Sequence, residues 1–363
     1  MAFDPRRLVQ ARQLAGLTKT TVAKEIGVSP MAVGHWETGT NPPRPDHIGA
    51  LSSLLDVPVA FLATGRPHTP VAESDAHFRS LRRTPTHQRK KATSYVEQVW
   101  ELALVLEKHV RLPQIDLPGY DNGEVTPVDS RPAEAAQMLR KEWGLGRGPI
   151  PRVVRTMEKH GIVVTLSEFA GDATPTIDAF STSRLPRPIV VLTPERARDV
   201  FRHRFTAAHE LGHLILHGDA PPGDLKLEKE ADEFAAEFLT PAAEISQRLP
   251  TRLNLQVLDA LSKEWGVSIE SLIYRCRELG TISEAAYRRA FQRLNQLRKV
   301  DLFVHSPVHQ HPGEIPTMLQ SAQRIAAENG ISLMALADEL AIKPSRVRML
   351  LGQVDERPQL RLV

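Results

Sequence analysis

Cysteine is almost absent from this chain of 363 residues, which contains only Cys276. A single thiol excludes a disulfide framework and any zinc site built from several thiolates. Long apolar runs are missing as well, since none approaches the roughly 18 residues that a membrane span requires. The first 13 residues include Arg6, Arg7 and Arg12 with no apolar stretch behind them, unlike a secretory signal peptide. We therefore expect a cytoplasmic protein without a membrane partner.

Neither sign of charge dominates, because the chain has 46 Lys and Arg residues and 43 Asp and Glu residues. The composition, 41% hydrophobic and 25% charged, is that of a globular protein and excludes collagen-like, coiled-coil and wholly disordered chains. At roughly 100–200 residues per domain, the length predicts two or three domains. A balanced total can hide a local patch. Residues 79–91 form one, with no acid and six basic residues: Arg79, Arg82, Arg83, Arg89, Lys90 and Lys91.

Residues 7–65 show the pattern of a helix-turn-helix. Gly16-Leu17-Thr18 opens one helix, Gly27-Val28-Ser29 forms a turn, and Trp36-Glu37 with Gly39 closes the next helix. In this arrangement the second helix enters the major groove of DNA with its N-terminus first. The candidate contacts are Lys19, Thr20 and Ser29 toward phosphates, and Pro30, Met31, Ala32 and His35 toward base edges.

This segment resembles the XRE/Cro-type repressor domain, a five-helix fold, and the resemblance implies double-stranded DNA as a partner. The chain departs from the family at Lys19 and Thr20, where a DNA-contacting glutamine is usual. The alternative is a small helical bundle for protein contact. The basic run at 79–91 is either a further source of phosphate contacts or a solvated linker.

A second motif lies in residues 207–217, where His209 and His213 are four residues apart on an apolar helix. That spacing puts both imidazoles on one face, close enough to share a metal ion. With Glu210 they form the H-E-x-x-H signature of zinc peptidases. Two imidazoles and one carboxylate leave zinc a fourth position for water, and Glu210 is then the general base. His203, just upstream, is expected on the surface.

The third ligand is expected on the acidic helix that follows. Glu228 and Asp232 are four residues apart and share a face, whereas Glu230 shares its face with Phe234, an expected core residue. We therefore expect Glu228 to bind zinc and Asp232 to orient an imidazole by a hydrogen bond. Glu230 is an alternative ligand, and His217, one turn beyond His213, is a weaker one.

Residues 161–241 resemble the ImmA/IrrE family of zinc metallo-endopeptidases. The resemblance implies a zincin-like core, with a small twisted sheet over the active-site helix, a bound Zn²⁺, and cleavage of a repressor-type protein in a stress or mobile-element response. The alternative is a non-proteolytic transcription factor or antitoxin whose zincin-like domain is a sensor or docking module. The matching residues are Arg204-Phe205-Thr206, Ala208 to His213, Glu228, Ala231, Asp232 (where Asn is common), Phe234 to Ala236, and Leu239-Thr240-Pro241.

These observations together predict an α+β protein that is mostly α. We expect a DNA-binding domain at 1–66, a basic linker and connecting helix at 67–130, a peptidase domain with a helical subdomain at 131–300, and a linker with a small helical domain at 301–363. Strands are expected at 161–166, 177–181 and 189–192, where β-branched residues concentrate.

Two later segments repeat the spacing of the first helix-turn-helix. The copy at 258–280 is expected to pack on the peptidase domain. The copy at 331–351 has Lys343, Arg346 and Arg348 nearby, which predicts a helical domain for nucleic-acid binding or for a homodimer contact.

Overall fold

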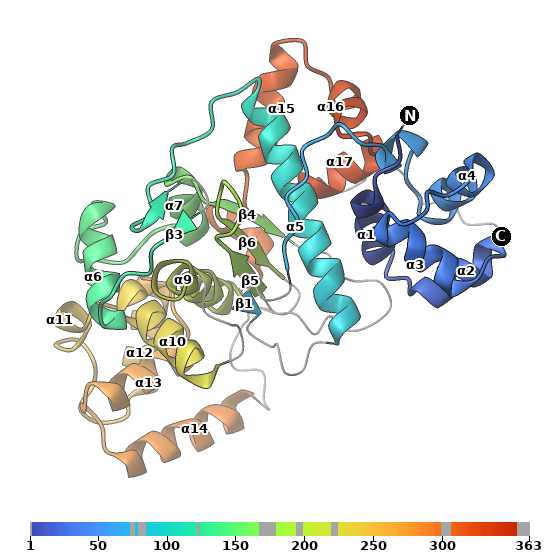
Figure 1. Ribbon diagram of the computed structural model, residues 1–363. Coiled ribbons are helices and arrows are strands. Elements are labelled where there is room, and N and C mark those ends of the chain that lie inside the picture. Colours follow the sequence, from blue (N-terminus) through green and yellow to red (C-terminus); the bar gives the residue numbers. More distant parts are fainter. Residues whose placement is uncertain are drawn as a thin grey trace, which may run out of the picture. The chain divides into compact units, whose positions relative to one another are not determined.

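The computed structural model describes residues 2–72, 77–78, 85–121, 124–166, 179–193, 199–218, 224–298 and 306–353. They belong to two compact units, and the expected fold class is confirmed: the protein is mostly helical with a small mixed sheet (Figure 1). Unit 1 comprises residues 1–73, 83–112 and 317–363, and unit 2 comprises 74–82 and 113–316. None of the helices in the described part of the chain has the length and apolarity to cross a membrane.

Unit 1 begins with the N-terminal helices, which are closed by local capping. The hydroxyl of Thr18 accepts the Thr21 N–H, and the hydroxyl of Ser29 accepts the Ala32 N–H. Gly27 ends the second helix with φ +71°, which glycine adopts without strain. Where five helices were expected, there are four α-helices and a 3₁₀ helix: α1 (Pro5–Leu14), α2 (Lys19–Ile26), α3 (Pro30–Thr38), α4 (Pro45–Leu54) and η1 (Val59–Leu62).

The rest of unit 1 is one long helix, α5 (Thr86–Glu107), and three C-terminal helices that pack against it. All but one of the residues from Ala92 to Leu106 are buried. Helix α1 is tied to α5 by buried polar contacts, such as Gln10 Nε2 to Glu97 Oε2 at 3.0 Å. The segment expected to form a separate C-terminal domain is therefore part of the N-terminal unit, as α15 (Met318–Glu328), α16 (Leu333–Leu340) and α17 (Pro344–Leu350).

Unit 2 contains a mixed sheet in the order β1-β5-β6-β4. Strands β4 and β6 are parallel, and the other pairs are antiparallel. The strands follow the apolar, β-branched segments of the sequence, and every residue of β5 and β6 is buried. The bounds are β1 (His77–Phe78), β4 (Val163–Leu166), β5 (Ala179–Thr182) and β6 (Ile189–Leu192), with a separate pair β2 (Tyr120–Asp121) and β3 (Glu124–Val125).

The helices of unit 2 share one hydrophobic core with this sheet. Helix α9 packs on β5, on β6 and on α10, and a glycine permits its close approach to α10. A Cβ atom added at Gly212 would lie 3.0 Å from the Phe234 ring. The helices are α6 (Pro132–Glu142), α7 (Val153–Lys159), α9 (Val200–Leu216), α10 (Leu225–Leu239), α11 (Ala242–Ile245), α12 (Leu255–Trp265), α13 (Ile269–Glu278) and α14 (Glu284–Arg298).

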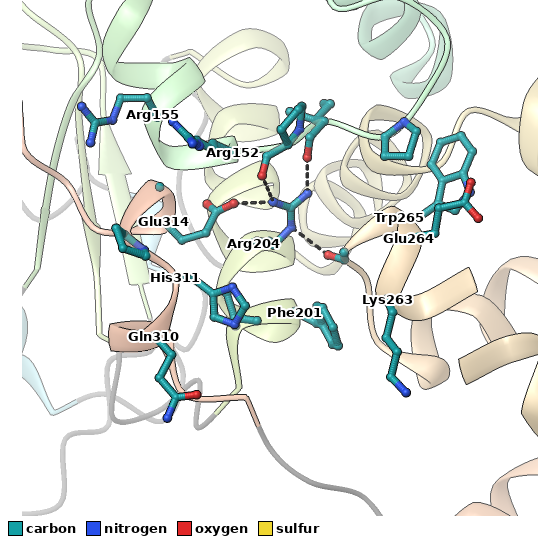
Figure 2. Close-up of a pocket in the computed structure, with 17 residues that line it drawn as sticks. Arg152, Arg155, Phe201, Arg204, Lys263, Glu264, Trp265, Gln310, His311 and Glu314 are labelled. Atoms are coloured by element: carbon teal, nitrogen blue, oxygen red, sulfur yellow. Dashed lines mark hydrogen bonds and ion pairs between the residues drawn. The ribbon is translucent and has the colours of Figure 1, made fainter. Parts of the chain in front are cut away.

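Residues 306–316, which the sequence suggests as part of a linker, are anchored in unit 2. They contain η3 (Val308–Gln310) and η4 (Pro312–Glu314). The buried Glu314 carboxylate accepts the Val153 N–H at 3.0 Å, which caps α7, and pairs with Arg204 of α9. Figure 2 shows the Arg204 guanidinium between this carboxylate and main-chain carbonyls. Residues 301–305 lie outside the described residues.

Candidate metal centre and nucleic-acid interface

Helices α9 and α10 bring His209, His213 and Glu228 together. The two Nε2 atoms are 3.1 Å apart. The Glu228 carboxylate lies 3.5 Å from the Nε2 of His209 and 3.6 Å from the Nε2 of His213. The three ligand atoms lie within 4.8 Å of one another. Both imidazoles are buried, whereas the Glu228 side chain is 21% exposed. The cluster is therefore reachable from the side of α10.

The outer nitrogen of His209 faces Asp232. The Nδ1–Oδ1 distance is 2.8 Å, so the imidazole donates its Nδ1 hydrogen to the carboxylate and turns the Nε2 lone pair toward Glu228. Asp232 occupies this place because it follows Glu228 by one helical turn on α10.

The outer nitrogen of His213 faces His217, and this contact continues to Glu230. The two Nδ1 atoms of the histidines are 2.8 Å apart, and His217 Nε2 lies 3.1 Å from Glu230 Oε2. When His213 presents an Nε2 lone pair, its Nδ1 hydrogen is donated to His217, whose own Nε2 hydrogen goes to Glu230. The sequence suggests His217 and Glu230 as alternative ligands; in the structure His217 contacts His213, and Glu230 contacts His217.

This donor set fits a divalent cation. When both ring hydrogens are on Nδ1, donated to Asp232 and His217, the two Nε2 atoms present lone pairs 3.1 Å apart beside a carboxylate. These atoms repel one another unless a positive charge lies among them. Two imidazoles and one carboxylate are the ligands that zinc takes in sites with an open position for substrate. The chemistry of the residues therefore suits a catalytic metal.

Glu210 lies next to the cluster and is fully buried on the sheet side of α9. Its Oε2 accepts a hydrogen bond from the Ser181 hydroxyl at 2.7 Å. Ser181 is on β5, whose pattern in the sequence indicates a strand but gives no reason to single out one residue. The contact joins residues 29 positions apart and depends on how the sheet packs on α9.

One residue of unit 2, His203, does not lie where the sequence predicts it. His203 is buried, not on the surface, and its Nε2 lies 3.0 Å from the Glu314 main-chain oxygen; burial lowers the pKa of this histidine.

A cavity of about 420 Å³ lies near the N-terminal end of α9, lined by Phe201, Trp265 and His311 among others (Figure 2). Its lining does not include the three ligand candidates, which lie further along α9 and on α10.

The seven candidate DNA contacts of unit 1 are exposed or half-exposed, and the Met31 side chain is 69% exposed. The Ser29 hydroxyl serves as the cap of α3. The Lys19 ammonium lies 3.2 Å from the Glu37 carboxylate, which also pairs with Arg12, so part of its charge is neutralised. Of the basic run at 79–91, Arg79, Arg82 and Arg83 lie outside the described residues.

Comparison with known families agrees with both motifs. Residues 8–62 match the helix-turn-helix family, over α1 to η1. Residues 157–277 match the IrrE N-terminal-like domain, a stretch that contains β4 and the helices carrying His209, His213 and Glu228. No curated protein matches the chain. The chain thus joins an XRE-type helix-turn-helix DNA-binding domain to an IrrE N-terminal-like domain of the metallopeptidase type.

Proposed function

We propose that this protein is a transcriptional regulator with a zinc-dependent endopeptidase domain, and that it cleaves a repressor-type protein in a stress or mobile-element response. The observation that carries the proposal is the meeting of three metal-ligand candidates with Glu210, in a metallopeptidase-type domain of a chain that also has a DNA-binding domain. In this proposal helix α3 binds double-stranded DNA. The protein encounters both the DNA and the repressor-type substrate in the cytoplasm.

The residues have separate tasks in this proposal. His209, His213 and Glu228 hold Zn²⁺, which would polarise the scissile carbonyl and make water more acidic. Glu210 takes a proton from the attacking water and passes it to the leaving amine. Ser181 fixes the Glu210 carboxylate by its hydrogen bond. Asp232 and His217 orient the two imidazoles.

The test is cleavage of XRE-type repressors by the zinc-loaded chain and by its Glu210→Gln variant. We expect the variant to lose activity by a factor of about 10²–10⁴, because a general base contributes that much, while it still binds one zinc ion. Glu233→Gln, an exposed change on the same helix as Glu228, is the matched control and should cleave like the parent chain. Unchanged cleavage by Glu210→Gln would refute the peptidase mechanism. DNA binding with zinc bound and no cleavage would favour a sensor or docking domain instead.

A further inference from the structure

The C-terminal helices of unit 1 repeat the first helix-turn-helix at a constant offset of 314 residues. Helix α15 ends at a turn with Gly330 at φ +87°, as α1 ends near Gly16 at φ +69°. Helices α2 and α16 both have eight residues. Helix α16 is capped by Ala341 with φ +51°, a left-handed conformation that a non-glycine residue rarely adopts. Ala341 is the residue equivalent to Gly27.

Three hydrogen bonds of the first segment have an equivalent in the second, whereas the Ser29 cap of α3 has none at Lys343 of α17. Each segment has a bond that closes its first helix, a bond that closes its second helix, and a side-chain cap. The equivalent pairs are Leu17 N to Arg12 O (3.1 Å) and Ile331 N to Ala326 O (3.0 Å), Val28 N to Ala23 O (2.9 Å) and Ile342 N to Ala337 O (3.0 Å), and Thr21 N to Thr18 Oγ1 (3.0 Å) and Ala335 N to Ser332 Oγ (3.1 Å).

The small cores of the two segments agree as well. The inward positions of the second and third helices are at most 5% exposed in both: Val22, Ala23, Val33 and Trp36 in the first, and Leu336, Ala337, Val347 and Leu350 in the second. Residues 318–350 therefore form a second helix-turn-helix, which the family match at 8–62 does not include. The turn at Gly266 between α12 and α13 is similar, but the helix that precedes α12, α11 (Ala242–Ile245), has four residues against ten in α1.

The second module has apolar side chains at two of the three positions where the first has candidate phosphate contacts. The positions equivalent to Lys19 and Thr20, where phosphate contacts are expected, are Leu333 and Met334. The position equivalent to Met31 is Ser345. Lys343, the equivalent of Ser29, is paired with Asp56, so part of its charge is neutralised. A module with apolar side chains at two phosphate-contact positions and a neutralised lysine at the third lacks the main source of affinity for DNA.

The recognition-helix equivalent, α17, is engaged with α5 instead. Arg346 donates from Nε to Gln98 Oε1 at 2.7 Å, and its guanidinium lies 5.7 Å from the centre of the Tyr95 ring. Burial lowers the pKa of Arg346 to about 10. The turn before α17 is held too, because the Leu340 main-chain oxygen accepts a hydrogen bond from Arg66.

We propose that α15–α17 is a helix-turn-helix converted into an internal protein-docking module. Its third helix binds α5 through Arg346, the equivalent of Ala32, and the chain reads DNA through α3 alone. The inference goes beyond the proposed function, since it concerns residues that neither the metal centre nor the α3 interface uses.

Equivalent substitutions in the two modules test the DNA half of this inference. Met31→Glu and Ser345→Glu each put a carboxylate at an exposed position in the first turn of the third helix. Binding is measured by fluorescence anisotropy on a labelled 30-base-pair duplex that the full chain selects from a random pool. Met31→Glu should weaken binding at least about tenfold, whereas Ser345→Glu should change it less than about twofold. Equal weakening by both would overturn the inference, and a parent chain that selects no duplex would contradict the DNA-binding function itself.

Hydrogen exchange tests the docking half. Arg346→Ala should speed amide exchange in α5 at least about tenfold, because α5 loses a buried partner. Arg348→Ala, two residues further on the same helix and half-exposed, is the matched control and should leave α5 unchanged. Unchanged exchange of α5 in Arg346→Ala would overturn the docking role, whatever the DNA experiment shows.

Discussion

At the scale of single residues, the site follows from helical spacing up to a point. The i, i+4 rule brings His209 beside His213 and puts Glu228 on the same helix face as Asp232. Both pairs can be predicted from the sequence. It cannot show that His217 meets Glu230, because that contact depends on how α9 and α10 cross. The crossing is set by the packing of Gly212 against Phe234, a property of tertiary structure.

The contact between His213 and His217 predicts an effect on metal affinity. His217→Ala removes the acceptor of the His213 Nδ1 hydrogen, so the imidazole loses its orientation and part of its basicity. We expect zinc affinity to fall by about 10–100-fold, measured by competition with a chromophoric chelator. Glu233→Gln should keep the parent affinity. An unchanged affinity in His217→Ala would show that the pair has no influence on the metal.

At the scale of elements, the secondary structure was largely predictable and the anchoring of segments was not. Strand β6 lies where the run of β-branched residues places it, and α10 carries Glu228 and Asp232 on the acidic helix that the sequence predicts. Residues 306–316 were expected to be part of a linker because they are rich in proline and histidine. Their fixed position comes from Glu314, whose partner Arg204 is 110 residues away and leaves no local signal.

The close contact between α9 and α10 predicts that alanine is not tolerated at Gly212. The added Cβ would lie 3.0–3.2 Å from Phe234 atoms, and overpacking of this kind costs about 1–3 kcal/mol. We expect the melting temperature of unit 2 to fall by a few degrees. In Gly49→Ala on α4 the new Cβ meets nothing within 4 Å, so this control should be neutral or stabilising. A stable Gly212→Ala protein would mean that the helices can separate at little cost.

The burial of His203 predicts a pH dependence of stability. Burial lowers the pKa of this histidine, so below pH 6.5 the unfolded chain binds a proton that the folded chain does not. The free energy of unfolding should therefore decrease as the pH is lowered below 6.5, by at most about 1.4 kcal/mol per pH unit from this group. Glu314 and Arg204 face the ring and remain in His203→Gln, whose stability should fall less steeply between pH 7 and 5. Parallel slopes for the two proteins, from denaturant unfolding, would contradict this.

At the scale of the whole molecule, the two units are interleaved along the sequence. Unit 2 lies between the second and third segments of unit 1, apart from residues 74–82. Composition and linkers suggested four consecutive domains, because proline-rich stretches mark boundaries. The buried contact of α5 with α1 and its partly buried contact with α17 join distant segments, and no local pattern could reveal them.

The confinement of the donor set to unit 2 predicts where zinc acts. Zinc at 100 times its Kd adds about 2.7 kcal/mol to the stability of the part that binds it. Hydrogen exchange in α9 and α10 should slow when zinc is added to chelator-treated protein, whereas α1 and α17 should not respond. His209→Ala, which lacks one donor, should show no zinc effect in either unit. Equal slowing in both units would mean that the metal signal reaches the DNA-binding unit.

The interleaving of the units also sets an order of events at the ribosome. Translation proceeds from the N-terminus, so the donor set and Glu314 emerge before Thr317, where the last segment of unit 1 begins. Helix α5 is therefore without its C-terminal partner until the final stretch leaves the exit tunnel. Unit 2 can complete its fold while unit 1 is still incomplete, so the candidate metal centre of a growing chain forms before its DNA-binding unit is finished.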